Sequence, residues 1–220
     1  MKLKVMSYNI RHGQGIGKIY SLRSIAEAIA KENPDIVGLN EVYQIPPFLD
    51  QPKKLSEMLG MEYVFQSNVT YGPFGGYGNV ILTKGEIKTS ECIQLPKIAG
   101  IENRGIAIAE IFINNRNIYF GTTHLGLRKI DRDVQISHLT EYIRQYSPII
   151  FCGDFNGPVS ELSTLLKYYN LAGEYKTYPA NNPRKQFDYI FASKILSKTS
   201  SDAIASKASD HLPIVAEYII

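Results

Sequence analysis

The stretch Pro148-Ile-Ile-Phe-Cys-Gly-Asp-Phe-Asn156 decides the fold of this chain of 220 residues. Its apolar part predicts a buried strand, because β-branched and aromatic residues fit a sheet that is covered on both faces. Asp154 and Asn156 follow at once, and Gly153 permits close backbone approach. Two residues apart on an extended chain, this carboxylate and this amide face one substrate atom. The alternative is an Asx turn into a helix at Pro158.

The same arrangement recurs along the chain, where short polar motifs end apolar runs. It is found at residues 7–10, 39–42, 78–82, 123–125, 187–190 and 209–213. These motifs bring carboxylates, amides and two imidazoles to strand ends, where a protein built on sheets gathers a catalytic site.

The segments between these motifs predict the architecture. Helical spacing is found after Ser21, over 48–59 and over 131–146, and Pro158 suits the first position of a further helix. Consecutive strands fill 62–123, with a hairpin turn at Asn114-Asn115-Arg116-Asn117. Two packed sheets with helices on the outer faces satisfy every apolar face. We therefore predict an α/β (α+β) protein that forms a single domain over residues 1–220.

The composition excludes several classes of protein. With 44% hydrophobic and 20% charged residues, the chain is globular. A net charge of +3 permits an anionic substrate, but a duplex-binding protein usually has a stronger basic face. No apolar run suits a membrane span, and the N-terminus does not resemble a signal peptide, so a cytoplasmic location is expected. Cys152 lies in an apolar run and is expected to be a buried, inert thiol.

Several strand-end residues have a chemical interpretation and a structural alternative. An ionised Glu41 after an apolar strand is costly unless it is paired or metal-bound. Asn9 offers an amide oxygen to a hard cation. Its structural alternative is a residue of a turn. His211 has Asp188 available to orient it, as in a base with its orienting acid, and His124 is a second imidazole. We assign the two other histidines to loop and helix surface, with His12 able to line the edge of a cleft.

Together the seven motifs, in this order, resemble the endonuclease/exonuclease/phosphatase superfamily, the deoxyribonuclease-like metal-dependent phosphoesterases, over nearly the whole chain. The stretch from Thr177-Tyr178-Pro179-Ala180 to Phe191 resembles its small bacterial branch of metal-dependent hydrolases. The resemblance implies a four-layer sandwich of two mostly antiparallel sheets with helices on both outer faces.

The resemblance also implies a metal and a water. Glu41, with Asn9 and Asp210, is expected to hold Mg²⁺ or Mn²⁺. Asp154 is expected to orient or deprotonate the attacking water, and Asn156 to hold that water or a phosphate oxygen.

Five further residues receive roles at the phosphoryl group by the same resemblance. His211, oriented by Asp188, would contact that group or act as general base. His124 would donate to a phosphoryl oxygen or to the leaving group. Asn79 and Arg104 resemble supporting and phosphate-contacting positions.

Three positions depart from the family pattern. Asn40 stands where a glutamine usually precedes the metal-binding glutamate. Arg11 replaces an acidic ligand of abasic-site endonucleases, and His124 replaces their tyrosine. The last two differences argue against abasic-site repair.

We expect a phosphodiesterase that acts on a small phosphate-containing molecule or another flexible substrate, and infer no obligate protein partner. A nuclease is the first alternative, because six aromatic residues predicted in loops suit base stacking: Tyr43, Phe48, Tyr71, Phe74, Tyr77 and Tyr178. A catalytically silent binding module on the same fold is the second.

Overall fold

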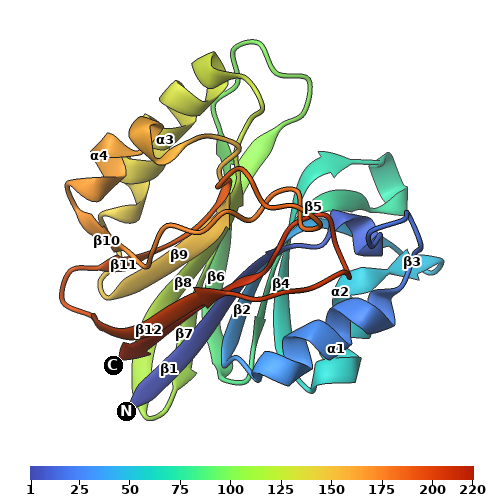
Figure 1. Ribbon diagram of the computed structural model, residues 1–220, viewed down its shortest axis with the longest axis horizontal. Helices are drawn as coiled ribbons and strands as arrows, with labels where there is room; N and C mark the ends of the chain where they lie inside the picture. Colours follow the sequence, from blue (N-terminus) through green and yellow to red (C-terminus); the bar gives the residue numbers. More distant parts are fainter.

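The computed structural model describes residues 1–220 and contains two β-sheets packed face to face (Figure 1). One sheet has seven strands in the order β12-β13-β1-β2-β5-β4, with β3 paired to β2. The other has six strands in the order β10-β11-β9-β8-β7-β6. Each sheet has one parallel pair, β1 with β2 and β8 with β9, and all other pairs are antiparallel. The predicted pair of mostly antiparallel sheets is confirmed.

The strands are β1 (Lys2–Asn9), β2 (Ile36–Ile45), β3 (Leu49–Asp50), β4 (Glu62–Thr70), β5 (Gly76–Thr83), β6 (Glu86–Leu95), β7 (Arg104–Ile113), β8 (Arg116–His124), β9 (Ile149–Asp154), β10 (Tyr169–Leu171), β11 (Asp188–Ser193), β12 (Ser197–Ala203) and β13 (Ile214–Ile219). The helices are α1 (Leu22–Glu32), α2 (Gln51–Leu59), α3 (Lys129–Ile143) and α4 (Ser163–Leu166). Three 3₁₀ turns are η1 (Arg11–Gly13), η2 (Gly72–Phe74) and η3 (Val159–Glu161).

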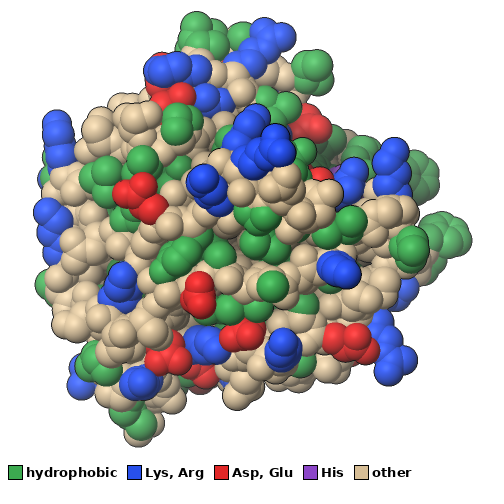
Figure 2. All heavy atoms as spheres, viewed as in Figure 1, with side chains coloured by type: hydrophobic (Ala, Val, Ile, Leu, Met, Phe, Trp, Pro, Cys, Tyr) green, Lys and Arg blue, Asp and Glu red, His purple; other side chains and the backbone are tan.

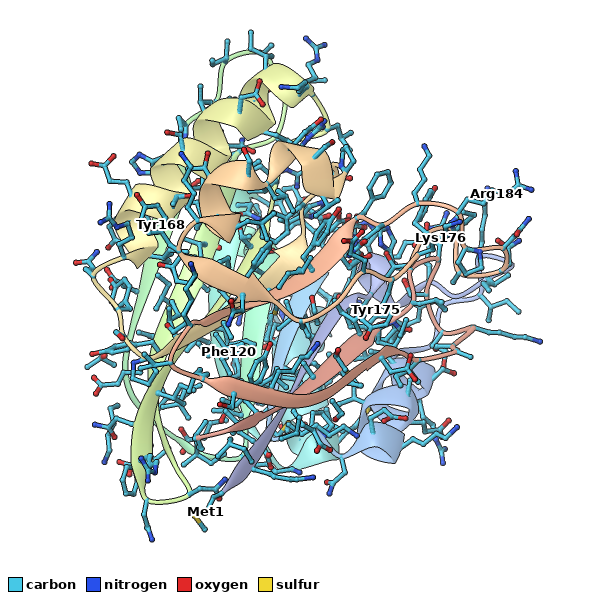
Figure 3. The ribbon with its side chains drawn as sticks, turned by 60° about the vertical axis from the view of Figure 1, so that its left-hand side comes forward. Met1, Phe120, Tyr168, Tyr175, Lys176 and Arg184 are labelled. Atoms are coloured by element: carbon cyan, nitrogen blue, oxygen red, sulfur yellow. The ribbon has the colours of Figure 1, made fainter.

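Three apolar clusters pack the four layers of helices and sheets against one another. The largest joins the inner faces of both sheets, and Figure 3 shows its residue Phe120 among the side chains that fill the sandwich. A second cluster packs α1 and α2 on the seven-stranded sheet, and a third packs α3 and α4 on the six-stranded sheet. Cys152 is buried in the first cluster as a free thiol, as predicted. None of the helices has the length and apolar character that a membrane crossing requires.

Several predicted boundaries were wrong for local reasons. The helix expected over 48–59 begins at Gln51, because Leu49–Asp50 pairs with β2 and the Asp50 side chain accepts from Lys53 N at the helix start. The helix expected to begin at Pro158 is only a 3₁₀ turn and one α-helical turn, since Pro158 has extended geometry with ψ 158°. The hairpin predicted at residues 114–117 is confirmed, but its turn is limited to Asn114 and Asn115, both with the positive φ of a tight β-hairpin turn, and Arg116 already belongs to β8.

The parallel pairs position the functional residues. In β1 and β2, Asn9 lies beside Asn40, and in β8 and β9, His124 lies beside Asp154. Asp188 begins β11 opposite Asp154. The carboxyl ends of β1, β8 and β9 and the irregular part of β2 around Asn40 therefore meet at one edge of the sandwich.

Candidate active site

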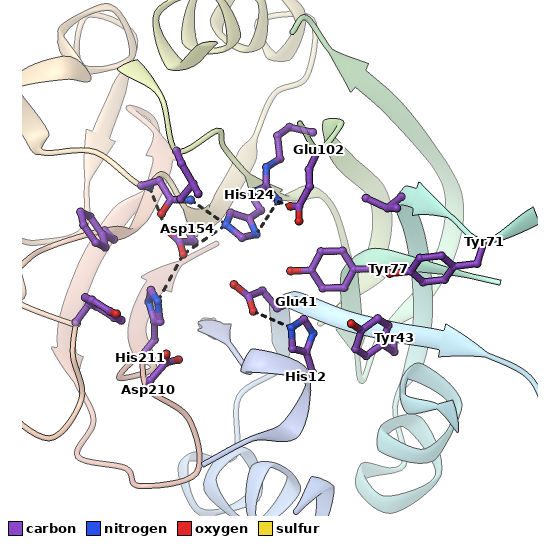
Figure 4. A pocket seen from close by; sticks show the side chains of 16 residues that line it. His12, Glu41, Tyr43, Tyr71, Tyr77, Glu102, His124, Asp154, Asp210 and His211 are labelled. Carbon is purple, nitrogen blue, oxygen red and sulfur yellow. Dashed lines mark hydrogen bonds and ion pairs between the residues drawn. The ribbon is translucent and has the colours of Figure 1, made fainter. Parts of the chain in front are cut away.

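A cleft of about 490 Å³ opens at this edge of the sandwich (Figure 4). Seven of the residues singled out in the sequence line it: Glu41, Arg104, His124, Asp154, Asn156, Asp210 and His211. The other three, Asn9, Asn79 and Asp188, are fully buried and lie behind the lining.

Asp154 is the centre of the site. Its Oδ2 accepts from Asn9 Nδ2 at 2.9 Å, and its Oδ1 accepts from Asn156 N at 2.9 Å. Burial first, and then the charge of Asp188, raise the pKa of Asp154 to about 7. A carboxyl group with that pKa can exchange a proton near neutral pH.

The local geometry corrects the sequence argument for Asp154 and Asn156. Strand β9 ends at Asp154, and Asn156 has φ 52°, so strand alternation does not put the two side chains on one face. The bond from Asn156 N to Asp154 Oδ1 is the Asx turn considered as the alternative. The turn and the cleft are compatible, because both side chains line it.

His211 is held by a carboxylate that never reaches the cleft. Its Nδ1 lies 2.9 Å from Asp188 Oδ2, which also accepts from Thr177 Oγ1 at 2.5 Å. Its Nε2 faces Asp154 Oδ2 at 3.7 Å. Burial disfavours the charged ring, but Asp188 and then Asp154 outweigh it and raise the pKa of His211 to about 10. His211 is therefore an imidazolium at neutral pH.

His124 has the opposite surroundings. Arg104 Nη1 lies 3.4 Å from its Nδ1, and Asn156 Nδ2 lies 2.9 Å from its Nε2. Both neighbours are hydrogen-bond donors, and a neutral ring accepts from only one of them at a time. Burial, followed by the charges of Arg104 and His211, lowers the pKa of His124 well below its usual value of 6.5.

Glu41 reaches the cleft through an irregularity in β2. The pairing of β2 with β5 shifts register between Leu39 and Val42, and Glu41 has φ 59°. A bulge of this kind re-aims a side chain, and positive φ in a non-glycine residue is uncommon. The carboxylate accepts from Asn9 Nδ2 at 3.1 Å and lies 3.5 Å from His12 Nε2.

Asp210 enters the cleft from the loop before β13. Its Oδ2 lies 3.3 Å from Arg11 Nε. The backbone N–H of Arg11 donates to Asn9 Oδ1 at 3.0 Å, and Ser209 Oγ donates to the Asn9 carbonyl at 2.7 Å. Glu41, Asn9 and Asp210 are therefore linked through one short hydrogen-bond network.

Two buried amides support the strand ends. Asn40 donates to Asn79 Oδ1 at 2.8 Å and accepts from Asp154 N at 3.0 Å. Asn79 in turn donates to Gln66 Oε1 and to the Gly105 carbonyl. Asn79 thus has no polar atom directed at the cleft, and its expected phosphate contact is replaced by a supporting role.

His12 lines the cleft, as the sequence interpretation allowed. Its ring stacks on Tyr43 at 4.6 Å between centroids and lies 5.1 Å from Tyr77, so three rings form one wall of the cleft (Figure 4). Buried Gln51 fixes this wall, since its side chain binds the His12 carbonyl at 2.7 Å and Tyr43 N at 2.8 Å.

The wall was hard to foresee because it depends on backbone geometry. Arg11, His12 and Gly13 all have positive φ, and only the glycine signals this in sequence. Of the six aromatic residues expected near a substrate, four line the cleft, and Phe48 and Phe74 do not. Phe48 is 84% exposed and Phe74 is 68% exposed.

Comparison with known proteins places the chain in a family. A model of the endonuclease/exonuclease/phosphatase family matches residues 6–211. The uncharacterized protein YbhP of Escherichia coli K12 is 25% identical, over 97% of this chain and 95% of that protein.

Two solved structures share the fold. An endonuclease/exonuclease/phosphatase from Beutenbergia cavernae has a TM-score of 0.86 at 20% identity, over 100% of this chain and 72% of that one. The mannosyl-6-phosphatase Bt3783 of Bacteroides thetaiotaomicron has a TM-score of 0.82 at 19% identity, over 99% of this chain and 100% of that one. The resemblance read from the motifs is confirmed, and the chain belongs to the endonuclease/exonuclease/phosphatase family.

Proposed function

We propose that the protein is a Mg²⁺- or Mn²⁺-dependent hydrolase that cleaves a phosphodiester bond in a small or flexible substrate by attack of water. The observation that carries the proposal is the position of Asp154 between His124 and His211, whose Nε2 atoms lie 3.6 and 3.7 Å from its Oδ2. This set contains a proton acceptor and a fixed positive charge within one cleft.

The chain's own residues divide the proton chemistry. Asp154, whose pKa is about 7, accepts a proton from the water and orients it. His211, charged at neutral pH, donates a hydrogen bond to a phosphoryl oxygen as negative charge develops there. Asn156 Nδ2 lies 2.9 Å from both His124 Nε2 and the Leu125 carbonyl, so it holds a second oxygen by exchanging one of these contacts. Neutral His124 positions Asn156 and supplies an N–H from one ring nitrogen at most.

The oxygen ligands at the cleft fit a hard divalent cation. Glu41 and Asp210 line the cleft with 23% and 25% of their side chains exposed, and carboxylates are ligands that Mg²⁺ and Mn²⁺ prefer. Asn9 fits as a further ligand through Oδ1, because a carbonyl oxygen has a second lone pair beside the one that accepts from Arg11 N. When bound, the ion neutralises phosphoryl charge and polarises the P–O bond.

The cluster of Asp154, Asp188 and His211 is a second set of possible metal ligands, but it does not suit this ion. Ligand atoms of Asp154, Asp188 and His211 lie within 4.8 Å of one another. However, Asp188 is fully buried and its Oδ2 is bound to Thr177 and His211, while its Oδ1 has no partner and keeps negative charge beside the ring. We assign this group to the orientation of His211.

The size and charge of the site favour a small or flexible substrate. The volume of about 490 Å³ is in the range of small-molecule sites, and the net charge of +3 is low for a protein that binds duplex DNA.

The cytoplasmic location remains a prediction, and two free cysteines suit a reducing compartment.

A nuclease that acts on single strands is the second candidate. The wall of His12, Tyr43 and Tyr77, with Tyr71 at its edge, suits base stacking. Cleavage of a single-stranded oligonucleotide that weakens steeply between low and moderate salt would favour it. A flat salt response would favour the small substrate.

The decisive experiment is a panel of metals and substrates. Mg²⁺ and Mn²⁺ are tested with model phosphomonoesters, phosphodiesters and oligonucleotides, with and without a chelator. Asp154→Ala is expected to lose about 10²–10⁴-fold in turnover, while His138→Ala, on the exposed face of α3, is expected to match the unmodified protein. Equal turnover in Asp154→Ala, or full activity in the chelator, would exclude the proposal.

A further inference from the structure

Large apolar side chains project into solvent beside the mouth of the cleft. Ile98 and Ile101, on the loop between β6 and β7, are 56% and 92% exposed. Leu127 and Ile130, between β8 and the first turn of α3, are 75% and 52% exposed. Ile101 and Leu127 line one hollow of about 340 Å³. We call these four residues, with Lys97, Arg128 and Lys129, the rim patch.

The loops of the rim patch are held rigidly by buried polar groups of α3. Asp131 Oδ1 accepts from Ile98 N at 2.6 Å and from Ala99 N at 2.9 Å. Gln135 bridges the two loops, because it accepts from Gly126 N at 2.8 Å and donates to the Pro96 carbonyl at 3.1 Å. Both side chains are 1% exposed. The loops therefore cannot easily fold inward to bury their isoleucines.

Arg132 completes this support. Its guanidinium donates to the Leu127 carbonyl at 2.6 Å and forms two bonds with Glu161, at 2.8 and 3.0 Å. Ion pairs with this two-bond geometry are strongly oriented. Exposed apolar side chains gathered on a fixed support indicate an interaction surface.

The charges of the rim patch indicate the partner. Lys97 and Arg128 form no ion pair, and Lys97 Nζ donates to the Ile101 carbonyl at 3.2 Å. Lys129 is paired with Asp133. Figure 2 shows apolar and basic side chains side by side at the top of the molecule, where Figure 1 shows the loop between β6 and β7. Isoleucines among unpaired cations match the apolar interior and anionic headgroups of a lipid surface.

We propose that the rim patch docks the protein onto an anionic phospholipid surface. The hollow under it shares Glu102, Arg104 and Leu127 with the cleft, so docking brings the mouth of the cleft to the headgroup phosphates. The delivery of headgroup phosphoesters to the cleft rests on the proposed function, whereas the docking itself does not.

The test is sedimentation of the full chain with vesicles, of phosphatidylcholine alone or with phosphatidylglycerol. Binding is expected only when phosphatidylglycerol is present, and it should weaken with salt. The double variant Ile98→Ser/Ile101→Ser is expected to lose at least about tenfold in binding, and Lys97→Gln/Arg128→Gln about tenfold or more. Ile195→Ser is the matched control, because Ile195 is 71% exposed beside Pro148, at the opposite end of the sheet from Asp154.

Each outcome decides the proposal. Loss of binding in both double variants but not in Ile195→Ser supports it. No binding of the unmodified protein, equal loss in the control, or a concentration-dependent dimer that the isoleucine variant abolishes would overturn it. Turnover of a water-soluble phosphodiester should be unchanged in Ile98→Ser/Ile101→Ser. Failure of vesicle binding with normal turnover would therefore remove the docking surface alone, and absence of turnover would remove the proposed function alone.

Discussion

The two imidazoles beside Asp154 lie in similar places and have opposite charge states. His211 and His124 are both buried, with Nε2 3.7 and 3.6 Å from the same carboxylate oxygen. The pKa of His211 is raised to about 10, and that of His124 is lowered well below 6.5. The difference arises at the other ring nitrogen, which faces Asp188 in His211 and Arg104 in His124. Burial disfavours charge in both rings, so the neighbouring residue decides which one remains charged.

Removal of the charge on Asp188 should have the largest effect on this contrast. In Asp188→Asn the amide oxygen can still accept from His211, so the ring stays in place while its pKa falls. With a neutral ring at the phosphoryl group, we expect turnover to fall by about 10²–10³-fold. The measurement is kcat and KM on a phosphodiester, together with the NMR titration of His211.

Asp202→Asn is the control for this substitution, because Asp202 is an exposed acid on β12. It should leave both the rate and the titration unchanged. If Asp188→Asn retained the raised pKa of His211, or kept full turnover with a lowered one, the charge of His211 would not be what the reaction uses.

Removal of the Arg104 guanidinium beside His124 should reduce turnover less than removal of the charge on Asp188. In Arg104→Gln, His124 loses the positive neighbour that adds to the effect of burial, so its pKa rises. We expect a loss of about tenfold in kcat/KM, or roughly 1.4 kcal/mol, because Arg104 also lines the cleft. Arg104→Lys keeps the charge and should recover part of the loss. Equal rates for the glutamine variant and the unmodified protein would show that Arg104 has no part in turnover.

The stability of the fold should show the same contrast with pH. Below pH 6.5 the unfolded chain protonates His124 but the folded protein does not, so the free energy of unfolding decreases as pH falls. This contribution has a slope of at most about 1.4 kcal/mol per pH unit. His211 acts in the opposite sense, since its contribution is complete below pH 6.5 and is lost as pH rises toward its folded pKa of about 10.

Urea unfolding between about pH 5 and 7 measures this contribution as the difference in slope between the unmodified protein and His124→Asn, because Asp154, whose pKa is raised to about 7, adds an opposing slope to the total. His124→Asn should lose less stability than the unmodified protein as pH falls. Identical slopes in the two proteins would mean that His124 is not held neutral in the fold.

The sequence predicted those parts of the fold and site that depend on local pattern. Apolar runs located the strands, and the polar residue after a run placed Asn9, His124 and Asp154 at strand ends, while Asp188 stands at the start of the run that forms β11. The partner of His211 was also foreseen, because an acid at another strand end was available to reach it.

The other features of the site depend on backbone geometry that no repeating pattern of residues in the sequence indicates. The bulge that aims Glu41 into the cleft and the positive φ of His12 follow from tertiary contacts. Likewise, α3 buries Asp131 and Gln135 in place of apolar residues because they bind the loop between β6 and β7, far away in sequence. A pattern of apolar residues cannot reveal such partners.

The smallest expected effect separates the charge of Arg104 from the ion pair it makes. Glu102 Oε2 lies 3.0 Å from Arg104 Nη2, but the Glu102 side chain is 49% exposed while that of Arg104 is 6% exposed. An ion pair open to water contributes little, and the guanidinium is itself buried, with Nη1 3.4 Å from His124 Nδ1. Glu102→Gln should therefore change kcat/KM by less than about threefold, as weak surface ion pairs do, and should leave the pKa of His124 low. If Glu102→Gln lost as much activity as Arg104→Gln, the position of Arg104 would depend on the rim of the cleft, and the contrast between the two imidazoles would need Glu102 as a third determinant.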